Sequence, residues 1–200
     1  MFSGIVEEMG VVKIFEHNYG RARLSILAKT ILGDLRVGES VSVSGVCLTT
    51  VEVNECDFVV DVSAETLNVT SIGSFTVGVA VNLERATKLN ERIGGHLVSG
   101  HVDGIGTLRG RQEDGNSVIL TFDMPESVLR YCIRKGSITI DGVSLTINQI
   151  SGKSLTVAII PHTAKVTTLG LKQPGDFVNL ESDLIGKYVE RLMQNTGQLL

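Results

Sequence analysis

Apolar and polar residues alternate with a period of two along most of the chain. The pattern is clearest in "SVSVSGVCLTTVEV" (40–53), "DFVVDVS" (57–63) and "VAVNLE" (79–84), which are rich in Val and Thr. Glycine or other turn residues interrupt these runs about every eight to twelve positions. The pattern predicts short antiparallel strands.

The second half of the chain repeats the first. "SVSVSGVCLTT" (40–50) returns as "SITIDGVSLTI" (137–147), and the same shift of 97 carries "ETLNVTSIG" onto "HTAKVTTLG" and "VNLE" at 81 onto "VNLE" at 178. Aligning 40–86 with 137–183 without gaps gives 15 identities in 47 positions. The starts "SGIVEEMGVV" and "SGHVDGIGTL" also match, so an internal duplication is expected.

Each repeat is predicted to be a small closed or nearly closed β-barrel, because closure removes exposed strand edges. One helical turn is expected in each, in "AKTILGDL" (28–35) and "PESVLRYCI" (125–133). The domains are placed at 1–92 and 96–185, with a C-terminal segment at 186–200.

The period changes near the C-terminus. "DLIGKYVERLMQ" (183–194) places Leu184, Tyr188 and Leu192 on one side of a helix, with Val189 and Met193 beside them. This pattern predicts an amphipathic helix with Asp183 as its N-cap. Such a helix either docks on a partner subunit or packs on its own barrel.

Composition narrows the class of protein. The 200 residues are 42% hydrophobic, enough for one sizeable core or two small ones. A net charge of −4 and 4% aromatic residues without Trp argue against binding to nucleic acid. No stretch reaches the roughly 18 apolar residues that a membrane helix needs.

The lack of a recognisable targeting signal and the spacing of the cysteines favour a cytoplasmic location. The start "MFSGIVEEMG" has no basic region, and the three cysteines have no C-x-x-C spacing. Neither a disulfide framework nor a thiolate zinc site is predicted. The chain is therefore expected to be a soluble, unprocessed, cytoplasmic protein.

Cys47 is either an inert strand residue or a functional thiol. A free cysteine in a strand is more often a small core residue. However, Cys47 aligns with Ser144, and serine fills a core poorly. Both side chains are therefore predicted to face a polar cavity.

Two histidines lie in the glycine-rich run "ERIGGHLVSGHVDGIG" that joins the repeats. Glycine there permits close approach to a ligand, but a flexible linker with surface histidines remains an alternative. The five-residue step from His96 to His101 differs from the i, i+4 spacing of helical zinc ligands, so no metal site is predicted. His17 is expected to be exposed.

Several motifs together resemble the riboflavin synthase alpha-chain family. They are "MFSGIVEEMG", "GVCLT", "LERATKLNERIGGHLVSGHVDG", "KGSITIDGVSLT", "IPHTAKVTTLG" and "VNLESDLIGKY". The resemblance implies an all-β fold with two six-stranded Greek-key barrels plus a C-terminal α-helix, assembled as a homotrimer around that helix. It also implies a cofactor-independent transferase that makes riboflavin and a ribitylamino-pyrimidinedione from two molecules of 6,7-dimethyl-8-ribityllumazine, by moving a four-carbon unit.

A dismutation of this kind suits a duplicated barrel, since two identical substrates occupy two similar pockets. The family resemblance implies a site between the N-barrel of one subunit and the C-barrel of another. The residues implied for the first pocket are Gly4, Ile5, Val6, Cys47, Leu48, Thr49, Asp61, Val62, Ser63, Ala64, Glu65 and Thr66. Those implied for the second are Gly100, His101, Val102, Lys135, Ser144, Leu145, Thr146, Ala158, Ile159, Ile160, Pro161, His162 and Thr163.

Six polar residues match the catalytic positions of the family: Ser40, Cys47, His101, Ser144, Thr146 and Asp183. His101 is the expected proton carrier, since a histidine titrates near neutral pH. Cys47, Ser40 or a bound water would add to C7 of the substrate, and Asp183 would orient or accept a proton.

Two alternatives come from other classes of protein. A non-catalytic antenna protein would bind lumazine or flavin in one barrel, but such relatives tend to lose "GGHLVSGH" and the paired pockets. A ligand-free barrel would only mediate protein contacts. The family also suggests a protein partner, a separate lumazine-making enzyme that would dock with this chain.

Overall fold

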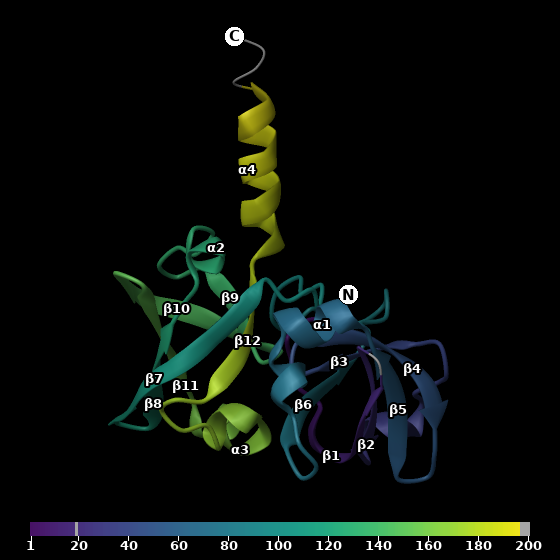
Figure 1. Cartoon of the computed structure of the whole chain (residues 1–200). Helices are drawn as coiled ribbons and strands as arrows, with labels where there is room; N and C mark the ends of the chain where they lie inside the picture. The colour runs from purple at the N-terminus through teal and green to yellow at the C-terminus, as the bar shows by residue number, and fades with distance from the viewer. Residues whose placement is uncertain (19, 197–200) are drawn as a thin grey trace.

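The computed structural model describes residues 1–18 and 20–196, and within them the strands form two closed barrels that lie side by side (Figure 1). The first, called the N-barrel, comprises β1 (Glu8–Asn18), β2 (Arg21–Leu27), β3 (Ser40–Val43), β4 (Val46–Val53), β5 (Asp57–Val62) and β6 (Ala80–Arg85). The second, called the C-barrel, comprises β7 (Gly104–Asp114), β8 (Ser117–Asp123), β9 (Ser137–Ile140), β10 (Val143–Ser151), β11 (Ser154–Ile159) and β12 (Phe177–Ser182).

Both barrels have the Greek-key connection. The N-barrel order is β1-β2-β5-β4-β3-β6, so β6 returns to lie beside β3 after the β3-β4-β5 meander. In the C-barrel β12 lies beside β9 in the same way. The predicted tandem of two six-stranded Greek-key barrels is confirmed.

Each barrel encloses its own hydrophobic core. Along β3 and β4 the side chains of Val41, Val43 and Leu48 point inward, while the alternate residues point out. Ile138, Ile140 and their neighbours fill the C-barrel in the same way.

The barrels meet at two equivalent hairpin turns. Ser44 and Gly45 have φ values of 46° and 84°, and Asp141 and Gly142 have 46° and 80°. Two consecutive positive φ values mark a type I′ turn, which glycine permits at low cost. A Cβ added to either glycine would lie 2.7 Å from the backbone nitrogen of the other, so the two turns are in direct contact.

Two asparagines lock this contact reciprocally. Asn82 donates to the carbonyl of Asp141 at 2.8 Å and accepts from the Thr168 amide at 2.8 Å. Asn179 donates to the carbonyl of Ser44 at 2.9 Å and accepts from the Ser71 amide at 2.7 Å. Every partner lies in the opposite barrel's half of the chain, so the two repeats form one unit.

The structure contains more helical turns than the sequence pattern predicted. The expected turns at 28–35 and 125–133 coincide with the 3-10 helix η1 (Ile31–Gly33) and with α2 (Glu126–Leu129). The additional ones are α1 (Ala64–Val69), η2 (Ser71–Ser74), α3 (Pro161–Val166) and η3 (Thr168–Gly170). Ser63 caps α1 through the Thr66 amide, and Pro161 opens α3, so local capping decides both helices.

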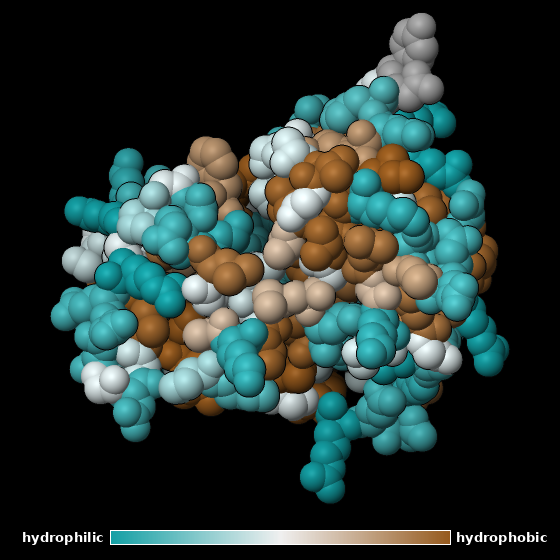
Figure 2. Space-filling model, turned by 90° about the horizontal axis from the view of Figure 1, so that it is seen from below, coloured by the Kyte–Doolittle hydropathy of each residue, from teal (hydrophilic) through white to brown (hydrophobic). Residues whose placement is uncertain are grey.

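The C-terminal helix α4 (Leu184–Thr196) projects away from both barrels (Figure 1). Its apolar side chains Ile185, Tyr188, Val189 and Met193 are exposed in the single chain. Figure 2 shows further apolar surface on the face seen from below, interrupted by hydrophilic side chains. In the described part of the chain, no helix is both long and apolar enough to cross a membrane.

Candidate functional site

The predicted N-barrel residues of β3 and β4 share the outer face of that barrel. Ser40 pairs with Thr49, and Ser42 pairs with Cys47. Since the alternate residues fill the core, these four short polar side chains form an outward stripe. Cys47 is partly exposed and Thr49 is exposed.

The C-barrel carries the matching stripe. Ser137 pairs with Thr146, and Thr139 pairs with Ser144. Thr146 is exposed and Ser144 is partly exposed, as their N-barrel counterparts are. The duplication therefore creates two outward stripes of hydroxyl groups, with one thiol in the first, and Ser42 and Thr139 are the buried member of each stripe.

Two segments that precede the barrels lie against these stripes. We call residues 2–6 the first entry segment and residues 98–102 the second entry segment. They pair with each other, since the Phe2 amide donates to the Val98 carbonyl at 2.7 Å and the Val98 amide donates back at 3.1 Å.

A buried glutamate holds each entry segment. Glu84 accepts from the Ser3 amide at 2.7 Å, the Ser3 hydroxyl at 2.8 Å and the Gly4 amide at 3.0 Å. Burial raises the pKa of Glu84, although these hydrogen bonds oppose the shift. Glu181 accepts the equivalent three bonds from Ser99 and Gly100, at 2.7, 2.7 and 2.9 Å.

A histidine distinguishes the second stripe from the first. His96 Nδ1 lies 2.7 Å from Ser144 Oγ, and Nε2 lies 3.1 Å from Thr139 Oγ1. Burial lowers the pKa of His96, while the charges of Asp183 and Glu181 oppose this shift. A neutral imidazole donates through one nitrogen and accepts through the other, so it fixes both hydroxyl groups.

The other predicted polar residues around the C-barrel are more open. His101 is exposed, and its amide donates to Ser99 Oγ at 3.2 Å. Asp183 is partly exposed at the start of α4 and accepts from the Ile185 amide at 3.0 Å. Lys135 is exposed with a positive φ of 68°.

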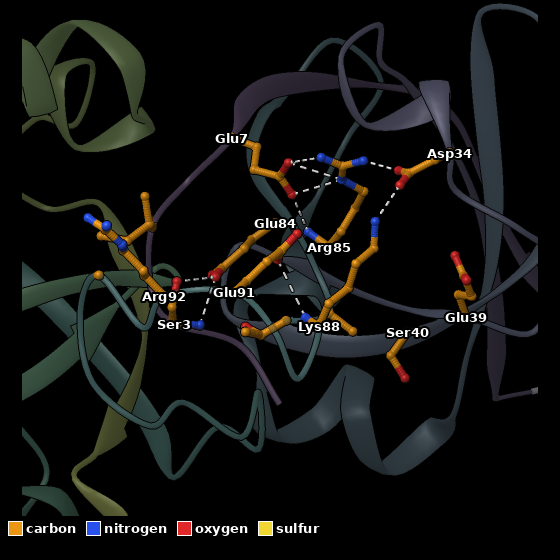
Figure 3. Close-up of a pocket in the computed structure, with 14 residues that line it drawn as sticks. Ser3, Glu7, Asp34, Glu39, Ser40, Glu84, Arg85, Lys88, Glu91 and Arg92 are labelled. Atoms are coloured by element: carbon orange, nitrogen blue, oxygen red, sulfur yellow. Dashed lines mark hydrogen bonds and ion pairs between the residues drawn. The ribbon is translucent and has the colours of Figure 1, made fainter.

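A polar cavity of about 440 Å³ opens beside Ser40 (Figure 3). Arg85 donates through Nε to both carboxylate oxygens of Glu7, at 3.1 and 3.0 Å, and also pairs with Asp34. Lys88 donates to Asp34 at 2.8 Å. Burial would raise the pKa of Glu7, but the hydrogen bonds and charge of Arg85 outweigh burial and lower it.

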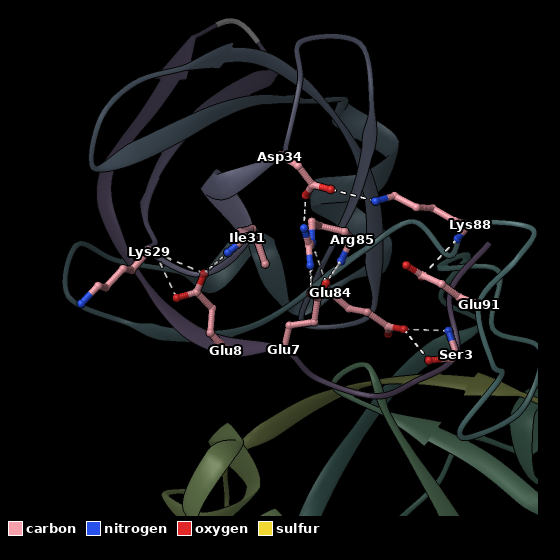
Figure 4. A network of polar contacts seen from close by, with 10 residues as sticks. All are labelled: Ser3, Glu7, Glu8, Lys29, Ile31, Asp34, Glu84, Arg85, Lys88 and Glu91. Atoms are coloured by element: carbon pink, nitrogen blue, oxygen red, sulfur yellow. Dashed lines mark hydrogen bonds and ion pairs between the residues drawn. The ribbon is translucent and has the colours of Figure 1, made fainter.

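These ion pairs compensate the charges of Arg85 and Lys88, while Arg92, Glu39 and Glu91 also line the cavity. Figure 4 shows that Glu7 and Asp34 pair with Arg85 and Lys88. The Ser3 and Ser40 hydroxyls also line the cavity. Hydroxyl groups of a ligand could hydrogen-bond to either kind of side chain.

A second cavity of about 870 Å³ lies over the end of β5. Asp61, Val62 and Ser63 line it, together with residues of β1 and β2. Of the predicted N-barrel residues, Ile5 and Ser40 line the first cavity and Asp61, Val62 and Ser63 line the second. Cys47 and Thr49 line neither of these two cavities.

The remaining predicted residues differ in what they can present to a ligand. Four are buried members of the barrel cores: Leu48, Val62, Leu145 and Ile159. Others are exposed or partly exposed: Ile5, Ala64, Glu65, Thr66, Ala158, Ile160, Pro161, His162 and Thr163. In the described ranges, no cluster of three or more His, Cys, Asp or Glu side chains could hold a metal ion.

Sequence reasoning missed the structural roles of His96, Glu84 and Glu181. The linker interpretation of His96 is wrong, because its ring is half-buried against Ser144. The signal for the glutamates was present: an acidic residue ends the apolar run "VNLE" in both repeats. A charge that recurs at the end of a buried strand indicates a specific partner.

The lumazine binding domain model matches residues 3–86 and 99–183. The chain is 45% identical to riboflavin synthase of Mycobacterium tuberculosis (strain ATCC 25618 / H37Rv), covering 98% of this chain and 100% of that protein. It is 41% identical to riboflavin synthase of Bacillus subtilis (strain 168), covering 99% and 92%. The Schizosaccharomyces pombe riboflavin synthase is 38% identical, covering 97% and 94%.

Solved structures of a related binding protein share the fold. LumP complexed with riboflavin superposes with a TM-score of 0.85 at 26% identity, covering 91% of this chain and 99% of that chain. LumP complexed with 6,7-dimethyl-8-(1'-D-ribityl) lumazine gives a TM-score of 0.83 at the same identity and coverage. The repeated family match and the full-length identity to synthases show that this chain belongs to the riboflavin synthase family and is an enzyme of that kind.

Proposed function

We propose that the protein converts two molecules of 6,7-dimethyl-8-ribityllumazine into riboflavin and 5-amino-6-ribitylamino-pyrimidinedione by transfer of a four-carbon unit. The full-length identity to riboflavin synthases carries this proposal. The two hydroxyl-lined stripes support it, since the reaction needs two similar sites for two identical molecules.

In this proposal most of the rate acceleration comes from positioning. Holding two reactants face to face supplies up to roughly 7–11 kcal/mol in the best intramolecular cases. Outward backbone and hydroxyl groups of the stripes, including Thr49 and Thr146, suit the pyrimidinedione edge and the ribityl hydroxyls. The paired charges beside Ser40 provide further partners for hydroxyl groups.

Proton transfer and addition at C7 belong to side chains that remain accessible. His101 is the proposed proton carrier, because it is exposed within the second entry segment. Cys47, Ser40 or a bound water would add to C7, and Asp183 would orient or accept a proton. Replacing His101 or Cys47 by Ala is expected to reduce turnover at least about tenfold. Activities of both variants within about twofold of the parent would reject the assignments.

The productive site is proposed to lie between the N-barrel of one subunit and the C-barrel of another in a homotrimer. Exposed apolar residues of α4 support this, because a 13-residue helix standing alone in water is marginal. The Val189→Glu, Met193→Glu double variant should sediment as a monomer, with the exposed Arg191→Glu as the matched control. A trimer that survives the double variant would reject α4 as its organiser.

The remaining proposals are the division of the chain into 1–92, 96–185 and 186–200, a cytoplasmic location, and association with lumazine synthase. The division is supported by the separate cores of the two barrels and by the start of α4 at Leu184. No cofactor is proposed, because the substrate itself supplies the reactive heterocycle.

The decisive experiment mixes purified, metal-free protein with 6,7-dimethyl-8-ribityllumazine alone and follows both products by chromatography. One riboflavin formed per two lumazines consumed would establish the dismutation. Tight binding without turnover would instead indicate a carrier or antenna protein; LumP has been solved in complex with riboflavin and with the lumazine.

A further inference from the structure

The entry segments cross from one barrel to the other. The first entry segment precedes the N-barrel, yet its Gly4 carbonyl accepts from the Ser144 amide of the C-barrel at 2.8 Å. The second precedes the C-barrel, yet its Gly100 carbonyl accepts from the Cys47 amide of the N-barrel at 2.8 Å. Val6 packs against the C-barrel core and Val102 against the N-barrel core, so the crossing extends beyond one hydrogen bond.

The approach of these segments to the stripes is close. A Cβ added to Gly100 would lie 2.6 Å from Cys47 Cβ, and one added to Gly4 would lie 2.6 Å from Ser144 Cβ. Both glycines have positive φ, of 80° and 76°. Each entry segment therefore covers one flank of the outward residue of the other barrel.

The position of each segment is set from its own barrel. Glu84 lies on β6 of the N-barrel and takes three hydrogen bonds from Ser3 and Gly4. Glu181 lies on β12 of the C-barrel and takes the same three from Ser99 and Gly100. Every one of these bonds needs an acceptor, and a carboxylate offers two oxygens that both accept.

We propose that Glu84 and Glu181 are positioning residues that act across the two barrels. Glu84 holds the first entry segment in place over Ser144, and Glu181 holds the second entry segment in place over Cys47. Each glutamate acts through the entry segment of its own barrel on the stripe of the opposite barrel. The consequence for catalysis rests on the proposed function, whereas the covering of each stripe by the entry segment of the opposite barrel does not.

A direct path within one barrel is the competing explanation. Glu84 pairs with Ser42 across β3 and β6, and Ser42 pairs with Cys47, so Glu84 lies two strands from Cys47 in its own sheet. Glu181, Thr139 and Ser144 have the same arrangement. If this path dominated, each glutamate would act on its own barrel.

Thiol alkylation separates the two paths. In a Cys56→Ser, Cys132→Ala background, Cys47 is the single thiol, and iodoacetamide labelling is followed by mass spectrometry at one pH. Glu181→Gln places an amide NH₂ against backbone donors, so it should raise the labelling rate at least about tenfold through local opening of the segment. Glu84→Gln, its matched control, should leave the rate within about twofold.

Adding Cys47→Ser and Ser144→Cys moves the thiol to the other stripe, where Glu84→Gln should accelerate labelling and Glu181→Gln should not. Should a Gln variant fail to fold, Ser99→Ala and Ser3→Ala remove one bond from each carboxylate and should show the same crossed pattern. Equal effects on both thiols, effects within the same barrel, or no effect would overturn the proposal. Labelling does not depend on turnover, so these outcomes are distinguishable from failure of the proposed reaction.

Discussion

The N-barrel and the C-barrel share three features where they meet: a type I′ turn, an asparagine that bonds across, and a glutamate that holds an entry segment. On the outward stripes the barrels differ. Ser144 and Thr139 contact His96, whereas no imidazole among the described residues is hydrogen-bonded to Cys47 or Ser42. The contact between the barrels joins equivalent features of the two repeats, so both sides must stay complementary to each other. A stripe needs to fit only its ligand, so the two stripes can differ. Under the proposed function, two identical substrate molecules bound at the stripes meet unequal surroundings, as donor and acceptor roles require.

Substitution of the turn glycines should have the largest effect on the symmetric contact between the barrels. Gly45→Ala and Gly142→Ala should each lower the free energy of unfolding by at least about 3 kcal/mol, because the new Cβ meets both an unfavourable φ and the opposite backbone. Denaturant titration measures the loss. Gly38→Ala, with φ of 91° and open space around it, should cost only about 1–2 kcal/mol. Clearly unequal losses at 45 and 142 would contradict the symmetry.

The asparagines should give the next largest effect. Asn82→Ala leaves the Asp141 carbonyl and the Thr168 amide without partners, and Asn179→Ala does the same to Ser44 and Ser71. Each buried orphan costs about 1–3 kcal/mol, so each variant should lose roughly 2–6 kcal/mol of unfolding free energy. The exposed Asn90→Ala is the control and should stay within about 0.5 kcal/mol of the parent.

Removing His96 should make the two stripes more alike. His96→Ala frees the Ser144 hydroxyl to rotate, so kcat for riboflavin formation should fall about tenfold, equivalent to about 1.4 kcal/mol in the barrier. Steady-state kinetics measures this change, with the exposed His17→Ala as control. A kcat for the His96 variant equal to that of its control would show that the imidazole has no part in turnover.

The smallest effect concerns pH. The pKa of His96 is lowered by burial in the folded protein, so the unfolded chain takes up a proton first as pH falls below about 6.5. Stability should therefore decline on acidification from pH 7 towards 5, by at most about 1.4 kcal/mol per pH unit from this group. His96→Gln should flatten this part of the profile. An identical slope in the variant would exclude His96 as its source.

Much of the fold was predictable because a duplicated period-two pattern leaves few solutions. The inward residues of β3 and β4 are the apolar ones in both repeats, and the two copies confirm each other. Helices α1 and α3 were missed because six residues are too few to show helical periodicity. Their caps, Ser63 and Pro161, were the available signal.

The site was less predictable than the fold. The outward direction of Ser40, Cys47 and Ser144 follows from strand alternation. In contrast, the contact of His96 with Ser144 depends on how the linker folds back over β10, and local sequence does not encode that path. The crossing of the entry segments has the same origin, since it joins residues about 50 to 140 positions apart.

During synthesis on the ribosome, the first of the two turns is made before the turn that it contacts. Gly45 meets Gly142, which emerges 97 residues later, or roughly 5–20 s at translation rates of about 5–20 residues per second. During that interval the turn lacks its partner, and the Asn82 side chain, once made, lacks the Asp141 carbonyl. Cys47 lacks its contact with Gly100 until that residue is made, 53 residues after Cys47. The nascent half-protein is thus the stage most open to mispairing with another copy and to thiol oxidation.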